Sequence, residues 1–223
     1  MAGRFRCVLF DLDGTLVDTA PDMVGTAQDM QQEEGRQLGD YQHLRRFVSR
    51  GSMGVIKAAF ENDSEAAQKD RVPRFLELYS RRLSRHSRLF EGMAPVLDEI
   101  ERRGACWGVV TNKPGWLTGP LMQDLGLANR AATVVCGDTL ARRKPDPDPV
   151  LHAMREAGAD AEATVFLGDD QRDVVAGRAA GVTTVAAAYG YLPPGEQIED
   201  WKADAVVRHP SEISALLEAL GSV

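Results

Sequence analysis

The chain has 223 residues, of which 43% are hydrophobic and 26% are charged, as is typical of a folded globular protein. Its 26 lysine and arginine residues are outnumbered by 33 aspartate and glutamate residues, which gives a formal net charge of -7. This balance argues against general nucleic-acid binding, and no stretch approaches the roughly 20 apolar residues that a membrane helix needs.

Short apolar runs recur along the chain, and each is continuous rather than alternating, as expected of strands that are buried on both faces. They cover residues 5–10, 105–110, 133–136, 164–167, 184–188 and 205–207. Helical patterns cover residues 95–103, 117–125, 147–157 and 172–180, and a last helix follows Ser211. Glycines stand where four of these helices should end. The alternation predicts an α/β fold, a Rossmann-like parallel sheet with helices on both faces.

Residues 17–88 have a different pattern, without a strand-like run. Their apolar residues follow helical spacing, for example Phe75, Leu76, Tyr79 and Leu83. We predict a small α-helical cap domain at 17–88, inserted into a core domain made of residues 1–16 and 89–223. The insert is too short to bury a large core alone. We therefore expect it to dock on the sheet as a lid.

Polar residues end several of the predicted strands. Asp11 and Asp13 follow the first strand, Thr111 and Asn112 follow the second, and Asp169 and Asp170 follow the fourth; Lys144 precedes a helix. Ligands of open parallel sheets bind beyond the carboxyl ends of the strands. The sequence therefore predicts a functional site where these residues meet.

The carboxylates of this group suggest a metal ion. Asp11 and Asp13 are two residues apart and point to the same side of an extended chain, whereas Leu12 points into apolar packing. Carboxylates this close repel one another unless a cation or a shared proton intervenes. An all-oxygen cluster suits Mg²⁺, and the absence of a neighbouring histidine or cysteine argues against zinc.

Each of these motifs has a simpler structural explanation when it stands alone. An isolated Asp-x-Asp-Gly is usually a turn, Thr-Asn after a strand is usually a helix cap, and Lys-Pro-Asp-Pro is usually a loop with a solvated lysine. All of them occur here in order, each at a predicted strand end or just before a helix. Their combination favours a catalytic site.

With these motifs the chain resembles the haloacid dehalogenase superfamily, in its phosphoglycolate phosphatase-like branch. The resemblance rests on FDLDGTLVDT at 10–19, TNKP at 111–114, KPDPDP at 144–149 and GDDQRD at 168–173. Within this branch, several segments look like those of bacterial N-acetylmuramic acid 6-phosphate phosphatases: residues 89–93, 107–114, 168–170 with 172–173, 189–191 and 201–204. Members of that group are often labelled phosphoglycolate phosphatases.

The resemblance implies roles for the residues at the strand ends. Asp11 is expected to be the nucleophile that forms an aspartyl-phosphate. Asp13 is expected to protonate the leaving oxygen and then to activate water. Thr111, with backbone donors near Asn112, should hold the phosphoryl oxygens, and Lys144 should neutralise the transferring charge and position Asp11.

The resemblance also implies a Mg²⁺ site. Its expected ligands are the Asp11 carboxylate, the Asp13 carbonyl and Asp169. Asp173 is expected to support the site from behind these ligands. Asp170 stands where relatives often carry serine, so we place it with Asp173 rather than among the ligands.

The implied reaction is hydrolysis of a small phosphorylated metabolite, and the expected substrate is N-acetylmuramic acid 6-phosphate, in cell-wall recycling. The alternatives are a phosphoglycolate phosphatase, a sugar phosphomutase of the same superfamily and a non-catalytic binding protein. Both candidate substrates carry a carboxylate, which arginine binds in a bidentate manner. Our hypothesis is that Arg50, next to Gly51 in the segment 49–52, contacts the carboxylate or the sugar; the simpler interpretation is a solvated arginine.

Other features of the sequence bear on packing and location. A run of Arg81, Arg82, Arg85 and Arg88 indicates a solvated helix face rather than an anion pocket. Trp107 and Trp116 are expected to pack in the interior, whereas Trp201 is expected to lie in a loop. The odd number of cysteines and the carboxylates that interrupt the first apolar run argue against secretion. We expect a cytoplasmic monomer or homodimer without a membrane or nucleic-acid partner.

Overall fold

A single parallel sheet of six strands organises the computed structural model, which describes residues 5–221. The strands are β1 (Cys7–Phe10), β4 (Cys106–Val110), β5 (Thr133–Val135), β6 (Thr164–Gly168), β7 (Thr183–Ala187) and β8 (Ala205–Val207). Their order across the sheet is β5-β4-β1-β6-β7-β8. All six predicted strands are present. Because β1 lies between β4 and β6, with Phe10 opposite both Val109 and Leu167, these three strands end side by side.

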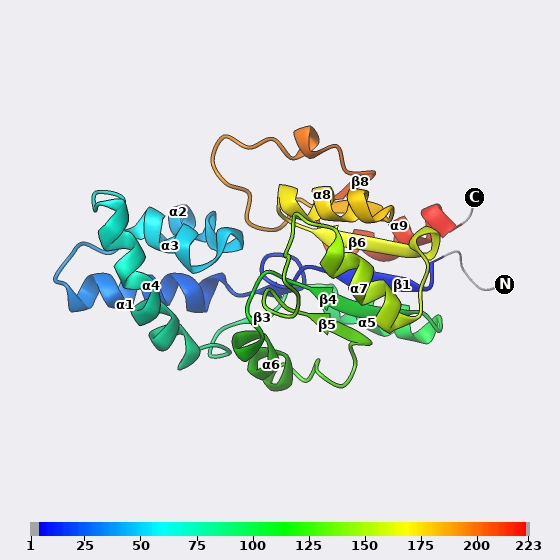
Figure 1. Ribbon diagram of the computed structural model, residues 1–223, viewed down its shortest axis with the longest axis horizontal. Helices are drawn as coiled ribbons and strands as arrows, with labels where there is room; N and C mark the ends of the chain where they lie inside the picture. Colours follow the sequence, from blue (N-terminus) through cyan, green and yellow to red (C-terminus); the bar gives the residue numbers. More distant parts are fainter. Residues whose placement is uncertain (1–4, 222–223) are drawn as a thin grey trace.

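Helices cover both faces of the sheet (Figure 1). They are α5 (Met93–Arg102), α6 (Gly115–Asp124), α7 (Asp148–Ala157), α8 (Gln171–Ala180) and α9 (Glu212–Gly221). Side chains alternate along β1, as the pleat of a strand requires. Val8 and Phe10 belong to the core cluster that includes residues of α5 and α9, whereas Cys7 and Leu9 pack in the cluster of α7 and α8. The prediction of an α/β fold with helices on both faces is confirmed.

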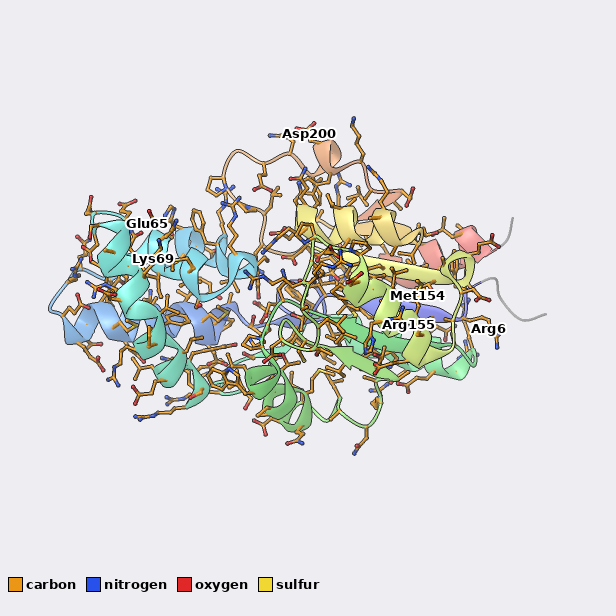
Figure 2. All side chains as sticks on the ribbon, in the orientation of Figure 1. Arg6, Glu65, Lys69, Met154, Arg155 and Asp200 are labelled. Atoms are coloured by element: carbon orange, nitrogen blue, oxygen red, sulfur yellow. The ribbon has the colours of Figure 1, made fainter. Side chains whose placement is uncertain are left out.

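A separate group of helices lies beyond the carboxyl end of β1 (Figure 1). It consists of α1 (Ala20–Glu33), α2 (Tyr41–Arg45), the short η1 (Val48–Arg50), α3 (Gly51–Ala59) and α4 (Glu65–Ser80). We call this group the helical unit. Figure 2 labels Glu65 and Lys69 on its outer helix α4, and Met154 and Arg155 on α7 of the sheet region.

Two short strands join the helical unit to the sheet region, and the sequence did not predict them. β2 (Val17–Asp18) pairs antiparallel with β3 (Arg88–Leu89). The prediction that no strand lies within 17–88 is therefore wrong at both ends of the segment. Two-residue strands carry too few side chains to produce a visible alternation.

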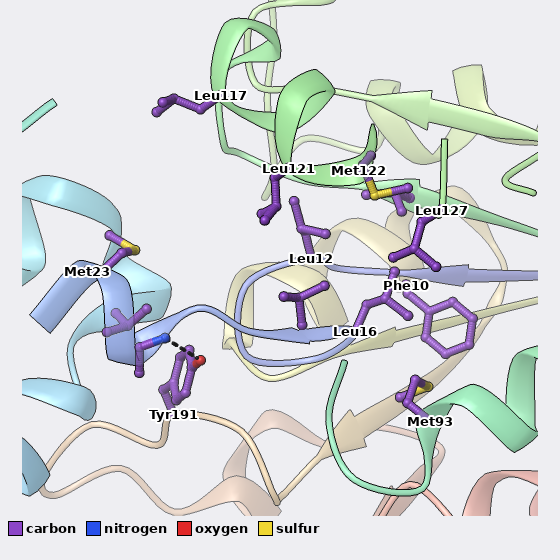
Figure 3. Packing of buried hydrophobic residues seen from close by; sticks show 14 of the residues in the cluster. Phe10, Leu12, Leu16, Met23, Met93, Leu117, Leu121, Met122, Leu127 and Tyr191 are labelled. Atoms are coloured by element: carbon purple, nitrogen blue, oxygen red, sulfur yellow. Dashed lines mark hydrogen bonds between the residues drawn. The ribbon is translucent and has the colours of Figure 1, made fainter. Parts of the chain in front are cut away.

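The loop after β1 is anchored by apolar packing. Leu12 and Leu16 are fully buried, and Figure 3 shows them among Leu121, Met122 and other core residues. Leu12 thus points away from the polar residues on either side of it, as predicted. The buried leucines hold Asp11 and Asp13 at the end of β1.

The tryptophans are only partly as predicted. Trp107 is fully buried, but Trp116 is 53% exposed, so its predicted interior position is wrong. In the first turn of α6, Leu117 rather than Trp116 packs in the core cluster. Trp201 lies in the short helix η3 (Ile198–Trp201) and is buried with Val174 and Ala186. None of the helices within residues 5–221 combines the length and apolar character that a bilayer crossing requires.

Candidate active site

The residues predicted from the strand ends meet at one edge of the sheet. The backbone N–H of Asp11 donates to the Leu167 carbonyl at 2.8 Å, and that of Thr111 donates to the Val135 carbonyl at 2.9 Å. These bonds continue the sheet ladder one residue past β1 and β4. The backbone register therefore fixes where Asp11 and Thr111 lie.

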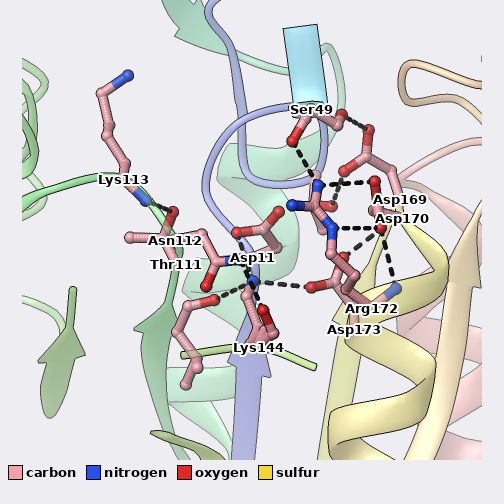
Figure 4. Close-up of polar contacts among 12 residues, drawn as sticks. Asp11, Ser49, Thr111, Asn112, Lys113, Lys144, Asp169, Asp170, Arg172 and Asp173 are labelled. Carbon is pink, nitrogen blue, oxygen red and sulfur yellow. Dashed lines mark hydrogen bonds and ion pairs between the residues drawn. The ribbon is translucent and has the colours of Figure 1, made fainter. Parts of the chain in front are cut away.

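Lys144 is buried at the centre of this edge (Figure 4). Its Nζ lies 2.8 Å from Asp11 Oδ1 and 2.7 Å from Asp173 Oδ1, and it donates to the Val110 carbonyl at 2.6 Å. Burial alone would lower the pKa of Lys144, but the charges of Asp11 and Asp173 raise it above its ordinary value. The side chain is an ammonium ion that holds Asp11 in place.

Asp11 and two other buried carboxylates form an acidic cluster. One oxygen from each of Asp11, Asp169 and Asp173 lies within 4.8 Å of the others. Burial, and then the charge of Asp11, raises the pKa of Asp169 well above its usual value, and burial raises the pKa of Asp173 to about 7. Lys144 supplies one positive charge against the three negative charges of the carboxylates. The cluster therefore has an excess of negative charge that a divalent cation would balance.

The groups that donate hydrogen bonds to Asp169 do not balance this negative charge. Asp169 accepts hydrogen bonds from the Thr15 hydroxyl at 3.2 Å, the Ser49 hydroxyl at 2.6 Å and the Tyr191 N–H at 2.8 Å. All three donors are neutral, and within residues 5–221 Asp169 has no ion pair. An all-oxygen set of buried carboxylates fits Mg²⁺.

Gly14 explains how the loop after β1 comes so close to Asp169. Its φ is +91°, and a Cβ at this position would lie 2.0 Å from Asp169 Oδ2. Glycine alone meets both the positive φ and the close approach. The Asp-x-Asp-Gly motif therefore brings the two acidic strand ends together.

Magnesium should stabilise the fold through this cluster. We expect added MgCl₂ to raise the melting temperature of the protein, by the equivalent of about 2.7 kcal/mol at 100 times the dissociation constant. Asp169→Asn should abolish most of the shift. Asp13→Asn is the matched control and should keep it, because the Asp13 side chain lies outside the cluster. Differential scanning fluorimetry measures the shift, and an equal shift in Asp169→Asn would exclude Asp169 as a ligand.

Asp13 has different partners from Asp11. Its Oδ1 accepts a hydrogen bond from the Thr19 hydroxyl at 2.6 Å and from the Lys113 ammonium at 3.0 Å. We had not singled out Lys113 from the sequence. The only signal was its place directly after Thr111 and Asn112, at a strand end that was already implicated.

Thr111 and Asn112 organise the loop after β4. Thr111 Oγ1 accepts from the Lys113 N–H at 3.1 Å, and the Asn112 amide donates to the Lys144 carbonyl at 2.9 Å. The Asn112 side chain thus ties two loops of the site together. A role in holding phosphoryl oxygens through the backbone near Asn112 stays a prediction.

Asp170 and Asp173 together form the start of α8. Asp170 caps the helix, accepts from the Arg172 N–H at 2.9 Å and pairs with the Arg172 guanidinium at 2.7 Å. Burial opposes ionisation, but Arg172 lowers the pKa of Asp170 below its usual value. Asp170 is absent from the acidic cluster, whereas Asp173 belongs to it and contacts Lys144.

A pocket of about 310 Å³ opens between the sheet edge and the helical unit. Asp11, Asp13, Thr111 and Lys144 are among its polar lining residues. Its apolar and aromatic lining residues are Met23, Val48, Met53, Phe75, Leu76, Tyr79, Pro114 and Leu117. This volume lies at the lower end of the range of roughly 300–1,000 Å³ that is typical of small-molecule sites.

Arg50 and Gly51 also line the pocket, but Arg50 is ion-paired with Glu196. The arginine run of residues 81–88 does not line the pocket. Arg81, Arg85 and Arg88 are exposed, as predicted, but the run follows the end of α4 instead of forming a helix face, and Arg82 is only partly exposed. Arg81 pairs with Glu77, and Arg82 pairs with Asp29.

The parallel sheet, its acidic edge and the helical unit above the edge define an α/β protein with a capped site that suits a cation. The chain belongs to the haloacid dehalogenase-like hydrolase family, whose model matches residues 8–187. The resemblance seen in the sequence motifs is confirmed.

Curated relatives cover almost the whole chain. It is 43% identical to an N-acetylmuramic acid 6-phosphate phosphatase of Pseudomonas putida, over 97% of both chains. It is 42% identical to a phosphoglycolate phosphatase of Xanthomonas campestris, over 93% of this chain and 94% of that one. Both names are of phosphatases, in agreement with the predicted enzyme class.

Solved structures share the fold at lower identity. A protein of Haemophilus somnus, described as a predicted phosphoglycolate phosphatase, superposes with a TM-score of 0.83 at 24% identity, over 96% of this chain and 98% of that one. A haloacid dehalogenase-superfamily hydrolase of Geobacter sulfurreducens superposes with a TM-score of 0.74 at 22% identity, over 96% and 97%.

Proposed function

We propose that this protein is a Mg²⁺-dependent phosphatase that hydrolyses N-acetylmuramic acid 6-phosphate in cell-wall recycling. One observation carries the catalytic part of the proposal: Lys144 holds Asp11 in a buried acidic cluster, and both residues line the pocket. The three cysteines are unpaired, which agrees with a location in the cytoplasm. Residues 17–88 would be the cap of the enzyme.

Asp11 attacks the phosphorus atom of the substrate in the first step. The bond between phosphorus and the ester oxygen breaks, and its electron pair goes to that oxygen, which takes a proton from Asp13 and leaves as an alcohol. Lys144 opposes the negative charge that develops on the phosphoryl group. The step leaves the phosphoryl group covalently bound to Asp11.

Water attacks the phosphorus atom in the second step. Asp13, now a carboxylate, takes the proton from the water, the bond between phosphorus and Asp11 breaks, and inorganic phosphate leaves. Bound Mg²⁺, held by Asp11, Asp169 and the Asp13 carbonyl, would supply charge neutralisation at the phosphoryl oxygens. The helical unit covers the pocket and limits access of bulk water.

The lining of the pocket favours the sugar phosphate over phosphoglycolate. Beyond the polar edge lie Met23, Phe75, Leu76 and other apolar residues. Phosphoglycolate has no apolar group large enough to cover them, whereas N-acetylmuramic acid carries a sugar ring, an acetyl methyl and a lactyl methyl. The name of the Pseudomonas putida relative agrees with this choice, and that of the Xanthomonas campestris relative supports phosphoglycolate as the second candidate.

The function is tested by kcat/KM for three substrates in the presence of Mg²⁺. We expect N-acetylmuramic acid 6-phosphate to be hydrolysed faster than N-acetylglucosamine 6-phosphate, which lacks the lactyl group, and faster than phosphoglycolate. A preference for phosphoglycolate would overturn the substrate assignment. Release of phosphate without a bisphosphate requirement would exclude the phosphomutase, and any turnover would exclude a binding protein.

The substrate carboxylate has two candidate partners among the pocket arginines. Arg50 already pairs with Glu196, whereas Arg143 lines the pocket and has no side-chain partner within residues 5–221. We expect Arg143→Ala to lower kcat/KM for N-acetylmuramic acid 6-phosphate about 10-fold or more, since hydrogen bonds to charged groups are worth about 1.5–3 kcal/mol. The kcat/KM for N-acetylglucosamine 6-phosphate, which lacks the carboxylate, should not change.

The neighbouring Arg142 is the matched control, because it pairs with Asp146 and Asp148 and does not line the pocket. Arg142→Ala should leave kcat/KM unchanged for both substrates. A loss in Arg50→Ala rather than in Arg143→Ala would support the original hypothesis for Arg50.

A further inference from the structure

Lys113 is a buried lysine that lines the pocket and has no role in the two steps above. Its backbone is fixed on both sides, since its N–H donates to Thr111 Oγ1 at 3.1 Å and its carbonyl accepts from the Gly137 N–H at 2.9 Å. Only the direction of its side chain remains to be explained. That side chain leads the ammonium group away from Lys144 (Figure 4). The ammonium group contacts Asp13 instead.

The ammonium group of Lys113 joins the sheet edge to the helical unit. It donates to Asp13 Oδ1 at 3.0 Å and to the Tyr79 hydroxyl at 2.8 Å, and it lies 4.6 Å from the centre of the Tyr79 ring. Tyr79 is a buried residue of α4. The loops after β1 and β4 and the helical unit therefore meet at one charged group.

Stability alone gives a weak reason for this arrangement. Buried ion pairs contribute little net stability compared with apolar residues of similar volume, because both charges lose their hydration. The nucleophile already has its own ammonium partner in Lys144. A second buried lysine, placed on the carboxylate that must exchange protons with the substrate, points to a task in the reaction.

We propose that Lys113 is a positioning residue, which aims the Asp13 carboxyl group at the leaving oxygen when Tyr79 of the helical unit is docked on it. This inference rests on the proposed function, in which Asp13 gives its proton to the ester oxygen and later takes one from water. Docking of the helical unit thereby couples closure of the pocket to proton transfer.

The inference is tested with Lys113→Met and with Tyr79→Phe, which removes a single oxygen atom. A sugar phosphate needs a proton on its leaving oxygen, whereas p-nitrophenyl phosphate releases a stable phenolate without one. We expect Lys113→Met to lower kcat for the sugar phosphate about 10²-fold or more, the range of general acid catalysis. Tyr79→Phe should lower it less, and KM should change little in both.

Rapid mixing with p-nitrophenyl phosphate gives the more specific readout. In Lys113→Met the first step should stay fast and the second, which needs Asp13 as a base, should be slow. A burst of nitrophenol close to the enzyme concentration is therefore expected. If both substrates lose the same factor in the first step, the lysine supports the fold generally and the inference is overturned.

A double-mutant comparison separates this inference from the proposed function. In the Asp13→Asn background, Lys113→Met should lower kcat hardly any further, because the carboxyl group that Lys113 positions is absent. Additive losses would overturn the inference. If Asp13→Asn alone keeps the full rate, the proposed function has the wrong acid. Lys69→Met is the control, since Lys69 is an exposed lysine of the same helix as Tyr79 and pairs with Glu65.

Discussion

Asp11→Asn should lower the rate of phosphate release more than about 10⁴-fold, as expected when a covalent nucleophile is removed. The amide has nearly the same shape as the carboxylate, but it is too weak a nucleophile to attack phosphorus. The measurement is release of inorganic phosphate with Mg²⁺ and N-acetylmuramic acid 6-phosphate at saturating concentration.

The control for this variant is Asp200→Asn. Asp200 is an exposed residue of η3, labelled in Figure 2, and is not among the residues that line the pocket. Its replacement should leave the rate unchanged. The Asp11→Asn protein should melt at a temperature close to that of the unsubstituted protein. Lys144 keeps its ion pair with Asp173 in this variant, and the cluster loses one of its three negative charges. Retained activity in Asp11→Asn would refute the assignment of the nucleophile.

Lys144→Met should affect both activity and stability. Without the ammonium group, Asp11 and Asp173 are left as buried carboxylates with no cation between them. Breaking a buried ion pair by removing one partner typically costs about 3–5 kcal/mol. We expect a loss of this size in the free energy of unfolding by urea, measured with EDTA present, and a fall in kcat of about 10²–10³-fold.

A second substitution shows whether the charge imbalance is the cause. The double variant Lys144→Met and Asp173→Asn removes one of the two stranded carboxylates, so it should recover part of the lost stability. Lys69→Met, at an exposed ion pair, should change stability little. No recovery in the double variant would mean that lost packing rather than charge explains the effect.

The sheet and most of the acidic edge follow from local sequence. Continuous apolar runs announce the strands, and the parallel order of β4, β1 and β6 brings Asp11, Thr111 and Asp169 to one edge. The structure also explains the glycine of the Asp-x-Asp-Gly motif, because the residue at position 14 must have no side chain beside Asp169.

Contacts between distant segments were not predictable in the same way. Tyr79 shows only helical spacing, and nothing near it indicates that its hydroxyl meets Lys113, 34 residues away in the chain. The same is true of Ser49, which donates to Asp169 across 120 residues. Such contacts depend on how the helical unit sits on the sheet region. Trp116 was misplaced because a large apolar side chain favours the interior on average, whereas the α6 face decides the individual case.

Capture of the phosphoryl group on Asp11 tests the central claim most directly. The protein is mixed with Mg²⁺ and N-acetylmuramic acid 6-phosphate, quenched in acid within the first turnovers, and digested for peptide mass spectrometry. The proposed mechanism predicts that the peptide containing Asp11 gains the mass of one phosphoryl group, and that this gain disappears as substrate is exhausted. Turnover with that peptide unmodified at every time point, or with the phosphoryl group on another residue, would contradict it.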